Sequence, residues 1–444
     1  MGNTEETSGS QEVSTRQQQI AELARQKLAH GITSLNHHLD QEWMREAWRR
    51  TRKDGAAGVD GETADRYEQN LEENLADLLE RAKSGRYFAP PVKRAYIPKG
   101  KDQFRPIGIP TLEDKVLQRA WAMLLEPVFE EEFSDCSYGF RPKRKAQDAL
   151  QAMDRVLWSM GGGWIIDADI EKYFDTVDRR QLQEFVQKRV RDGVVRRIIG
   201  KWLQAGVMED GQLRYPDEGT PQGGVISPLL SNVYLHEVLD CWWEQEVQPR
   251  LSGRSDLFRF ADDFVMVFER EEDARRVMQV LAQRFARYGL RIHPDKTRLV
   301  DFRRPGPGAS GETFDFLGFR HYWGKSRKGR LIPKRKTASP RLSQKLNAIA
   351  KWCRAHRHDP VKQQQATLVR KLQGHYNYYG LTHNYPGLKR YYRGVCRVWR
   401  KWLNRRSRKR DLSWEAFNRL LKRYPLPLPH VVHTLYPRTG ESPS

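Results

Sequence analysis

Asp169 stands in a segment where a carboxylate is unfavourable unless it has a chemical role. The residues from Trp164 to Ile170 alternate in polarity, which predicts a strand with Ile166 and Ala168 on one face and Asp169 on the other. A carboxylate in such a strand is costly unless a metal ion or a partner compensates its charge. Asp169 is therefore a candidate metal ligand.

Asp262 and Asp263 form a second acidic feature. They join two apolar runs, Leu257 to Ala261 and Phe264 to Phe268, which predict a hairpin with adjacent acids near its turn. An Asp-Asp pair alone is usually a polar turn. Here the acids would emerge from a buried hairpin, where charge needs a metal ion or a partner.

These three carboxylates have the chemistry of a magnesium site. Magnesium is a hard cation that prefers oxygen ligands, and phosphoryl transfer needs two or three carboxylates that converge from different elements. Asp169 from one strand, with Asp262 and Asp263 from a hairpin, would meet that need.

The positive charge is concentrated in one part of the chain. The formal net charge is +22, yet the stretch from Lys325 to Arg410 holds 26 Lys or Arg residues against one acid, Asp359. A solvated or disordered tail is the alternative for such a run. This run also contains many Tyr and Trp residues, which can build a core or stack on bases, so we expect an ordered nucleic-acid-binding domain.

A smaller cationic cluster lies in the segment from Arg94 to Pro110. The segment predicts two short strands around a basic turn, with Lys99, Lys101 and Arg105 crowded at the hairpin tip. Such cations are either solvated or arranged to bind a triphosphate. The sequence leaves both interpretations open.

The cysteines and the hydropathy bear on the compartment. Cys136, Cys241, Cys353 and Cys396 lie far apart without a C-x-x-C pair, which disfavours a zinc module or a disulfide framework. No stretch has the roughly 18 consecutive apolar residues needed to cross a bilayer. We therefore expect a soluble cytoplasmic protein with no membrane partner.

Seven motifs occur in a characteristic order, and together they are far more specific than any one alone. They are Arg105-Pro-Ile-Gly-Ile-Pro110, Ser137-Tyr-Gly-Phe-Arg-Pro142, Asp169-Ile-Glu-Lys-Tyr-Phe-Asp175, Gly219-Thr-Pro-Gln-Gly-Gly-Val-Ile-Ser-Pro228, Phe260-Ala-Asp-Asp263, His293-Pro-Asp-Lys-Thr297 and Phe316-Leu-Gly-Phe319. From about Thr33 to His433 the chain resembles the reverse transcriptases and maturases encoded by bacterial group II introns.

The resemblance implies an α+β right-hand polymerase with fingers, a palm built on an antiparallel sheet, a helical thumb and a basic helical maturase region. Combined with the composition, it predicts five parts of the chain. These are a disordered leader (1–16), an N-terminal helical extension (17–90), the fingers and palm (91–324), a basic helical thumb and maturase region (325–424), and a Pro-rich tail (425–444).

The resemblance also implies roles for individual residues. Asp169 and Asp262 would bind two Mg²⁺ ions, with Asp263 in support, for RNA-directed synthesis of DNA. Residues expected to contact the incoming deoxynucleoside triphosphate are Lys99, Arg105, Phe174, Gln222 and Lys296, of which Phe174 would exclude a ribose 2′-hydroxyl. A surface ion pair is the alternative for Lys296, and a simple Gly-Pro turn is the alternative for residues 219–228.

The C-terminal basic region predicts an amphipathic helix. Its apolar face would be formed by Tyr391, Val395, Val398, Trp399 and Trp402, and its RNA-binding residues would be Arg393, Arg397, Arg400 and Lys401. The segment 372–380 resembles the maturase signature, although helix packing would explain about half of its residues.

The expected partners are group II intron RNA, an RNA template with a DNA primer, deoxynucleoside triphosphates and a DNA target. Dimerisation stays open. Two departures from the family pattern stand out: the double-acid motif begins with Phe260 in place of the commoner Tyr, and no Cys- and His-containing nuclease segment follows. We therefore do not expect cleavage of a second DNA strand. The alternative functions are a splicing cofactor with little polymerase activity and a free-standing polymerase recruited to host defence or repair.

Overall fold

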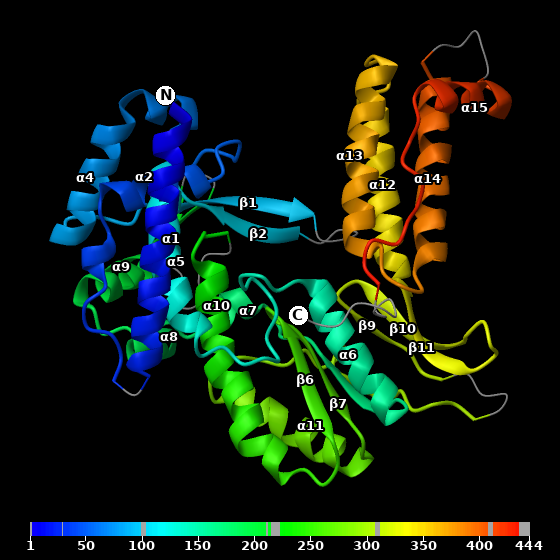
Figure 1. Ribbon diagram of the computed structural model, residues 1–444, viewed down its shortest axis with the longest axis horizontal. Helices are drawn as coiled ribbons and strands as arrows, with labels where there is room; N and C mark the ends of the chain where they lie inside the picture. Colours follow the sequence, from blue (N-terminus) through cyan, green and yellow to red (C-terminus); the bar gives the residue numbers. More distant parts are fainter. Residues whose placement is uncertain are drawn as a thin grey trace. The chain divides into compact units, whose positions relative to one another are not determined.

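The computed structural model describes residues 2–28, 30–98, 104–209, 212–214, 223–306, 311–406 and 412–434, with side chains from residue 9 onward. The chain forms two compact units (Figure 1). The first unit consists of Met1–Lys145, Ala168–Phe264 and Glu272–Arg298, and the second of Ala146–Asp167, Val265–Glu271 and Leu299–Ser444. None of the described helices combines the length and the apolar composition that a membrane crossing requires.

The first unit is built around α5 (Leu112–Glu130). The sequence from Thr111 to Phe129, with Asp114 in its first turn, predicts this helix. Trp121 and its apolar neighbours on α5 are fully buried, and α1 (Gly2–Gln26) and α2 (Gln41–Arg50) pack against this helix. The remaining helical elements of this part of the chain are η1 (Asn36–His38), α3 (Ala64–Tyr67), η2 (Glu68–Asn70), α4 (Leu71–Ser84), α7 (Tyr173–Thr176), α8 (Arg179–Arg189), α9 (Gly193–Gln204), α10 (Ser227–Leu235), η3 (His236–Asp240), η4 (Trp243–Val247), η5 (Gln248–Arg250) and α11 (Glu271–Ala286).

A four-stranded sheet of the first unit contains the predicted cationic hairpin. Strands β1 (Val92–Pro98) and β2 (Phe104–Ile109) pair in antiparallel fashion, and Arg105 lies opposite Ile97. The sheet order is β2-β1-β4-β5, with β4 (Val207–Glu209) parallel to β1 and antiparallel to β5 (Gln212–Arg214). The predicted hairpin is confirmed, while Lys99 and Lys101 at its tip lie outside the described residues.

Another four-stranded sheet has the order β6-β7-β3-β8. Its strands are β3 (Trp164–Ala168), β6 (Ser255–Phe260), β7 (Asp263–Phe268) and β8 (Arg298–Asp301), so both predicted acidic strand segments belong to it.

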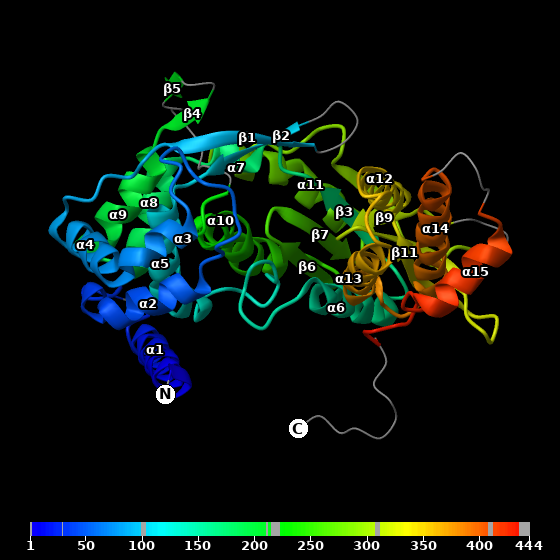
Figure 2. The same ribbon diagram turned by 90° about the horizontal axis from the view of Figure 1, so that it is seen from above.

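The second unit combines α6 (Ala146–Met160), a three-stranded antiparallel sheet and a helical bundle. The sheet order is β11-β10-β9, formed by β9 (Phe314–Phe316), β10 (Phe319–Lys325) and β11 (Leu331–Thr337). Figures 1 and 2 both show the bundle helices side by side: α12 (Ser339–Ala355), α13 (Val361–Tyr379) and α14 (Tyr385–Asn404), followed by α15 (Trp414–Arg423).

The leader predicted as disordered differs in the structure, which has α1 running from Gly2 to Gln26. Val13 is fully buried, and the Gln17 side chain donates a 2.8 Å hydrogen bond to the Met123 carbonyl. The helix therefore packs with few apolar residues, because polar side chains bind neighbouring elements instead.

Two other local predictions also need correction. The amphipathic pattern from Thr63 to Ser84 predicts one helix, but the segment divides into α3, η2 and α4, with non-helical backbone angles at Asn70 (φ −125°, ψ 41°). The basic, Gly-containing composition from Lys325 to Lys336 predicts a connector, but this segment is mostly strand, since β11 pairs with β10 over seven residue pairs. Arg335 is buried in this strand and forms a 2.5 Å ion pair with Asp154. Because a charged residue takes a buried position, the alternation of buried and exposed residues along β11 does not appear as an alternation of hydrophobicity in the sequence.

The segment that resembles the maturase signature packs within the second unit. His375 is buried between the rings of Tyr379 and Tyr391, with ring centroids 4.7 and 3.7 Å away. The Tyr376 hydroxyl donates to the Pro427 carbonyl at 3.0 Å, and the Tyr378 hydroxyl donates to the Leu317 carbonyl at 3.1 Å. These contacts support the packing interpretation for its aromatic residues.

Candidate active site

The hairpin of β6 and β7 presents the acidic pair as predicted. Only Ala261 and Asp262 separate the two strands, and β7 begins at Asp263. The five residues that follow Asp263 are all fully buried, whereas Asp263 is exposed and Asp262 is half-buried. Ala261 has a φ of +57°, a left-handed backbone conformation that residues other than glycine seldom adopt. The tight turn between β6 and β7 requires this conformation. A rigid apolar base thus carries two carboxylates at its tip.

Asp169 directly follows the last residue of β3. The predicted alternation is confirmed, because Ile166, Ala168 and Ile170 are buried while Asp169 is half-buried. The segment after β3 is fixed by an antiparallel bridge between Ile170 and Ile292, and the Asp169 carbonyl accepts a 2.8 Å hydrogen bond from the His293 amide.

Sheet geometry brings Asp169 to the acidic turn. Strand β3 is the neighbour of β7, and Gly163 at the start of β3 approaches the Phe268 carbonyl so closely that a Cβ there would lie 2.6 Å from it. The start of β3 therefore lies beside the end of β7, so the two strands run antiparallel. The end of β3, with Asp169, then lies beside the turn that carries Asp262 and Asp263.

Lys296 contacts the same carboxylate. Its Nζ lies 2.6 Å from Oδ2 of Asp169, and both side chains are about half exposed, at 53% and 44%. The surface ion pair anticipated as the alternative for Lys296 is thus present, and its partner is one of the three candidate aspartates. An exposed pair of this kind contributes only about 0–1 kcal/mol to stability. Its consequence is to hold a positive charge at the Asp169 carboxylate.

The chemistry of these donors fits magnesium. Carboxylate oxygens are the hard ligands that Mg²⁺ prefers, and Mg²⁺ in phosphoryl-transfer sites is held by one or two carboxylates together with water and substrate phosphates. Among the described residues, no three His, Cys, Asp or Glu side chains are gathered closely enough to hold a metal ion alone. A site built on Asp169 and Asp262 would therefore be completed by substrate oxygens.

Phe174 lies on α7, five residues after Asp169. It is half-buried, and its ring meets the ring of buried Tyr173 edge to face, with centroids 5.1 Å apart. The Tyr173 hydroxyl donates to the Ser231 carbonyl at 3.0 Å. Burial raises the pKa of Tyr173 well above its usual range, with a smaller contribution from the negative charge of Asp262. Tyr173 thus lies near Asp262 and supports the Phe174 ring from one side.

The remaining residues predicted to bind the nucleotide lie on the cationic hairpin (β1 and β2) and in residues 219–228, called here the glycine loop. Arg105 is exposed on β2, as a residue that binds a triphosphate should be. Lys99 and Gln222 lie outside the described residues. Gly223 has a φ of +115°, and a Cβ there would lie 2.4 Å from the Gly108 carbonyl. The glycines of residues 219–228 are expected to let the backbone approach substrate closely, but at Gly223 the close approach is made to the backbone of β2.

The sequence reading missed a buried carboxylate behind this loop. The Asp114 side chain accepts hydrogen bonds from the Tyr87 hydroxyl (2.6 Å), the Trp202 indole (2.6 Å) and the Gln118 amide (3.0 Å). Gln118 in turn accepts a 3.3 Å hydrogen bond from the Ile226 amide, at the end of the glycine loop. Burial raises the pKa of Asp114 to about 6, although the three donors oppose the increase.

Comparison with known proteins identifies the family. Residues 97–321, just over half of the chain, match the family described as reverse transcriptase (RNA-dependent DNA polymerase). The chain belongs to the reverse transcriptase family. The match includes all three candidate aspartates, the hairpin residue Arg105 and Lys296. Enzymes of this family generally use divalent metal ions.

Relatives of this chain include intron-encoded proteins. The chain is 34% identical over 332 residues to Protein YkfC of Escherichia coli (strain K12), which covers 65% of this chain and 83% of that protein. Group II intron-encoded protein LtrA of Lactococcus lactis subsp. cremoris is 38% identical over 182 residues, or 41% of this chain and 30% of LtrA. Nuclear intron maturase 2, mitochondrial, of Arabidopsis thaliana is 27% identical over 232 residues, 44% of this chain and 30% of that protein.

The predicted RNA-binding helix of this chain is α14. Its apolar face is confirmed, with Tyr391, Val395 and Trp399 buried and Val398 and Trp402 half-buried. The predicted basic residues divide into two groups. Arg393, Arg397 and Lys401 are exposed, whereas Arg400 is half-buried, donates to the Leu412 carbonyl at 2.8 Å and lies 4.6 Å above the Trp414 ring. Arg400 therefore anchors the segment that leads into α15.

A groove on α14 gathers cations that the sequence reading only partly named. It has a volume of about 410 Å³, and its basic lining comprises Lys389, Arg390, Arg393 and Arg397. Gly394 and Leu346 of α12 pack closely beneath it, since a Cβ on Gly394 would lie 2.6 Å from a Leu346 methyl carbon. Lys389 and Arg390 are one helical turn before Arg393. The helical spacing of the sequence could therefore have placed them on the same face as Arg393.

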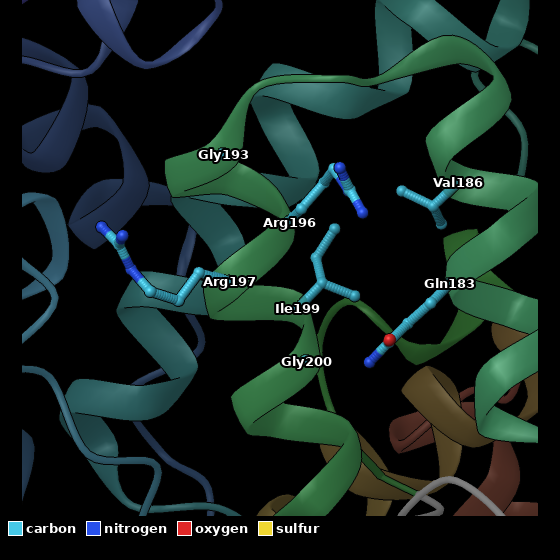
Figure 3. A pocket seen from close by; sticks show the side chains of 7 residues that line it. All are labelled: Gln183, Val186, Gly193, Arg196, Arg197, Ile199 and Gly200. Carbon is cyan, nitrogen blue, oxygen red and sulfur yellow. The ribbon is translucent and has the colours of Figure 1, made fainter.

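A different pocket of about 290 Å³ lies between α8 and α9 in the first unit. Figure 3 shows Gln183 and Val186 of α8 facing Ile199 and Gly200 of α9, while the Arg197 side chain extends away from them. Its lining includes none of the three candidate aspartates. This pocket is therefore separate from the candidate active site.

Proposed function

We propose that this protein is an RNA-directed DNA polymerase that copies RNA into DNA, with Asp169 and Asp262 as ligands of two Mg²⁺ ions and Asp263 in support. The observation that carries the proposal is the antiparallel placement of β3 beside β7, which brings Asp169 to the Asp262–Asp263 turn at one end of a sheet. Carboxylates from two separate strands are what nucleotidyl transfer needs.

Magnesium bound there would make the primer 3′-hydroxyl easier to deprotonate and would bind the triphosphate oxygens. The chain's own residues position the reactants. Lys296 keeps a positive charge beside Asp169, where the triphosphate would arrive. Exposed Arg105, with Lys99 and Gln222, would hold the nucleotide.

Selection of the sugar is assigned to Phe174. Its ring rests against buried Tyr173 and so cannot easily retreat from a ribose 2′-hydroxyl. Deoxynucleoside triphosphates are therefore the proposed substrates. The polymerase would have the right-hand arrangement, with fingers and palm from residues 91–324 and a thumb and maturase region from residues 325–424.

A second function, assistance of intron splicing and mobility, is favoured by the basic second unit. The groove on α14 offers Lys389, Arg390, Arg393 and Arg397, and none of the described residues that line it is acidic. Such a surface suits the phosphate backbone of a structured RNA. Because relatives include a group II intron-encoded protein and an intron maturase, group II intron RNA is the proposed ligand, with a DNA target for insertion. The four cysteines are free thiols, which fits a cytoplasmic setting.

Primer extension on a structured RNA template tests both halves together. The wild-type chain and Asp262→Ala are compared for DNA synthesis in magnesium, and the same samples are compared for binding of group II intron RNA. We expect extension by the wild type alone and equal RNA binding by both proteins. Extension by neither, with tight binding retained, would replace the polymerase proposal with a splicing cofactor.

A further inference from the structure

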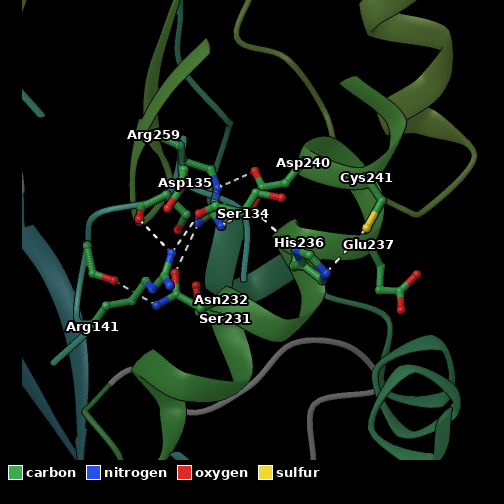
Figure 4. Close-up of polar contacts among 12 residues, drawn as sticks. Ser134, Asp135, Arg141, Ser231, Asn232, His236, Glu237, Asp240, Cys241 and Arg259 are labelled. Atoms are coloured by element: carbon green, nitrogen blue, oxygen red, sulfur yellow. Dashed lines mark hydrogen bonds and ion pairs between the residues drawn. The ribbon is translucent and has the colours of Figure 1, made fainter. Parts of the chain in front are cut away.

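The hairpin that carries the acidic turn also carries a buried arginine. Arg259 lies on β6, three residues before Asp262, and its side chain is fully buried. Figure 4 shows its guanidinium directed at Asp240, the last residue of η3. Nε donates to Oδ1 of Asp240 at 2.7 Å, and Nη2 pairs with Oδ2 of the same carboxylate. Both oxygens of a buried carboxylate are thus occupied by one guanidinium.

The third nitrogen of Arg259 reaches the acidic turn. Nη1 donates to the Ala261 carbonyl at 3.2 Å and to Oδ1 of Asn232 at 3.0 Å. The Ala261 carbonyl belongs to the peptide that leads into Asp262. Ala261 has a left-handed φ of +57°, which is unfavourable for a side chain with a Cβ. A charge-assisted hydrogen bond therefore supports the strained residue of the turn.

Gly139 packs against the backbone of the same turn. The Asn232 side chain donates a 2.7 Å hydrogen bond to the Gly139 carbonyl. A Cβ on Gly139 would lie 2.3 Å from the Ala261 amide nitrogen, so the two backbones touch. Cys136 and Tyr138 also exchange backbone hydrogen bonds with Arg259, each of 2.8 Å. The Arg259 guanidinium and the backbone of residues 136–139 therefore both hold the turn.

A purely stabilising role is a poor explanation for this ion pair. Two charges lose their hydration when they are buried, and a well-packed apolar pair of similar volume is often at least as stable. An apolar side chain at position 259 cannot donate hydrogen bonds to Asp240 and to the Ala261 carbonyl at the same time. A planar fork with several fixed donors can.

We propose that Arg259 is a positioning residue of the polymerase site: its fork, held by Asp240, fixes the Ala261–Asp262 peptide and thereby the direction in which Asp262 is presented. The proposal rests on the proposed polymerase function. Lysine at position 259 would keep a positive charge for Asp240 but could not form the same fork. The turn would then lose its hydrogen bond while the buried charge stays neutralised.

The test is steady-state primer extension by Arg259→Lys across a magnesium titration, beside a melting curve. The matched control is Arg335→Lys, which alters another buried Arg–Asp pair, in the second unit with Asp154. We expect Arg259→Lys to lower kcat about tenfold or more and to raise the magnesium concentration for half-maximal rate about threefold. Arg335→Lys should leave both quantities within about twofold of wild type.

Asn232→Ala provides a second test that leaves the Arg259–Asp240 pair intact. It removes one acceptor of Nη1 and the donor to Gly139, so kcat should fall about threefold while the KM for dTTP stays constant. Wild-type kcat and magnesium dependence in both Arg259→Lys and Asn232→Ala would overturn the proposal, as would equal losses in Arg335→Lys. Absence of extension by the wild type would instead refute the polymerase function itself.

Discussion

Replacement of Gly139 by alanine should disable the acidic turn without unfolding the protein. The new Cβ would lie 2.3 Å from the Ala261 amide nitrogen and 2.8 Å from the Phe260 carbonyl carbon. Ordinary contacts between such atoms need about 3.5 Å. Neither neighbour is a flexible side chain, because both atoms belong to the backbone that leads into Asp262. The turn must therefore move by about 1 Å.

The expected magnitudes differ for stability and for activity. Overpacking at a tight site costs about 1–3 kcal/mol. Misplacement of a reacting group by about 1 Å costs about a hundredfold in rate. We therefore expect Gly139→Ala to fold, with a lower melting temperature, and to extend primers about a hundredfold more slowly than the wild type.

Gly200→Ala is the matched control. Gly200 lies within α9, and its new Cβ would meet only the end of the flexible Gln183 side chain, at 3.2 Å. Alanine is better than glycine inside a helix by about 1 kcal/mol, so this variant should be equally active and slightly more stable. The assay is single-turnover incorporation of dTMP on poly(rA) with oligo(dT). A near wild-type rate for Gly139→Ala would refute the geometric reasoning.

Three further predictions concern other parts of the chain. The pKa of Asp114 is about 6 in the folded protein and about 3.9 in the unfolded chain. This difference adds about 3 kcal/mol to the free energy of unfolding below about pH 4, where the carboxyl is neutral in both states. The contribution is lost as the pH rises through 6. Urea unfolding at pH 4.5 and 7 should show that Asp114→Asn removes this difference, and an unchanged pH dependence would contradict the assignment. Phe174→Ala should raise incorporation of UTP relative to dTTP about tenfold or more in primer extension, since the ring no longer blocks the 2′-hydroxyl; unchanged sugar selection would exclude Phe174 from that role. Arg393→Gln combined with Arg397→Gln should weaken binding of structured RNA and reduce the magnitude of the slope of log K against log salt concentration by about 2. Filter binding at several salt concentrations measures this slope, and primer extension on a short duplex should continue. An unchanged slope would exclude the α14 groove from the RNA interface.

Local sequence patterns carried the elements that hold the acids. The hairpin around Asp262 and Asp263, the strand before Asp169 and the helix α5 were all predicted, because alternation and helical spacing are properties of neighbouring residues. The predicted connector from Lys325 to Lys336 was wrong, since Arg335 is a core residue of β11 only by virtue of its ion pair with distant Asp154.

The contacts that hold the acidic turn in place were beyond such patterns. Arg259, Asp240, Asn232 and Gly139 come from separate segments, and their spacing in the sequence does not indicate that they meet. Their common role depends on which backbones touch, which only the tertiary structure reveals. The sequence does contain one indication, because Arg259 stands inside an apolar strand. Arginine is seldom buried without a partner, so its position there predicts a buried acidic partner.

The central claim is that Asp169 and the Asp262–Asp263 turn form one metal-dependent polymerase site. It is tested most directly by primer extension on poly(rA) with oligo(dT) and dTTP, comparing the wild type, Asp169→Asn and Asp262→Asn across a magnesium titration. We predict magnesium-dependent synthesis by the wild type and a loss of about a thousandfold or more in each variant, with melting temperatures preserved. Synthesis by either variant at a rate near that of the wild type would contradict the claim.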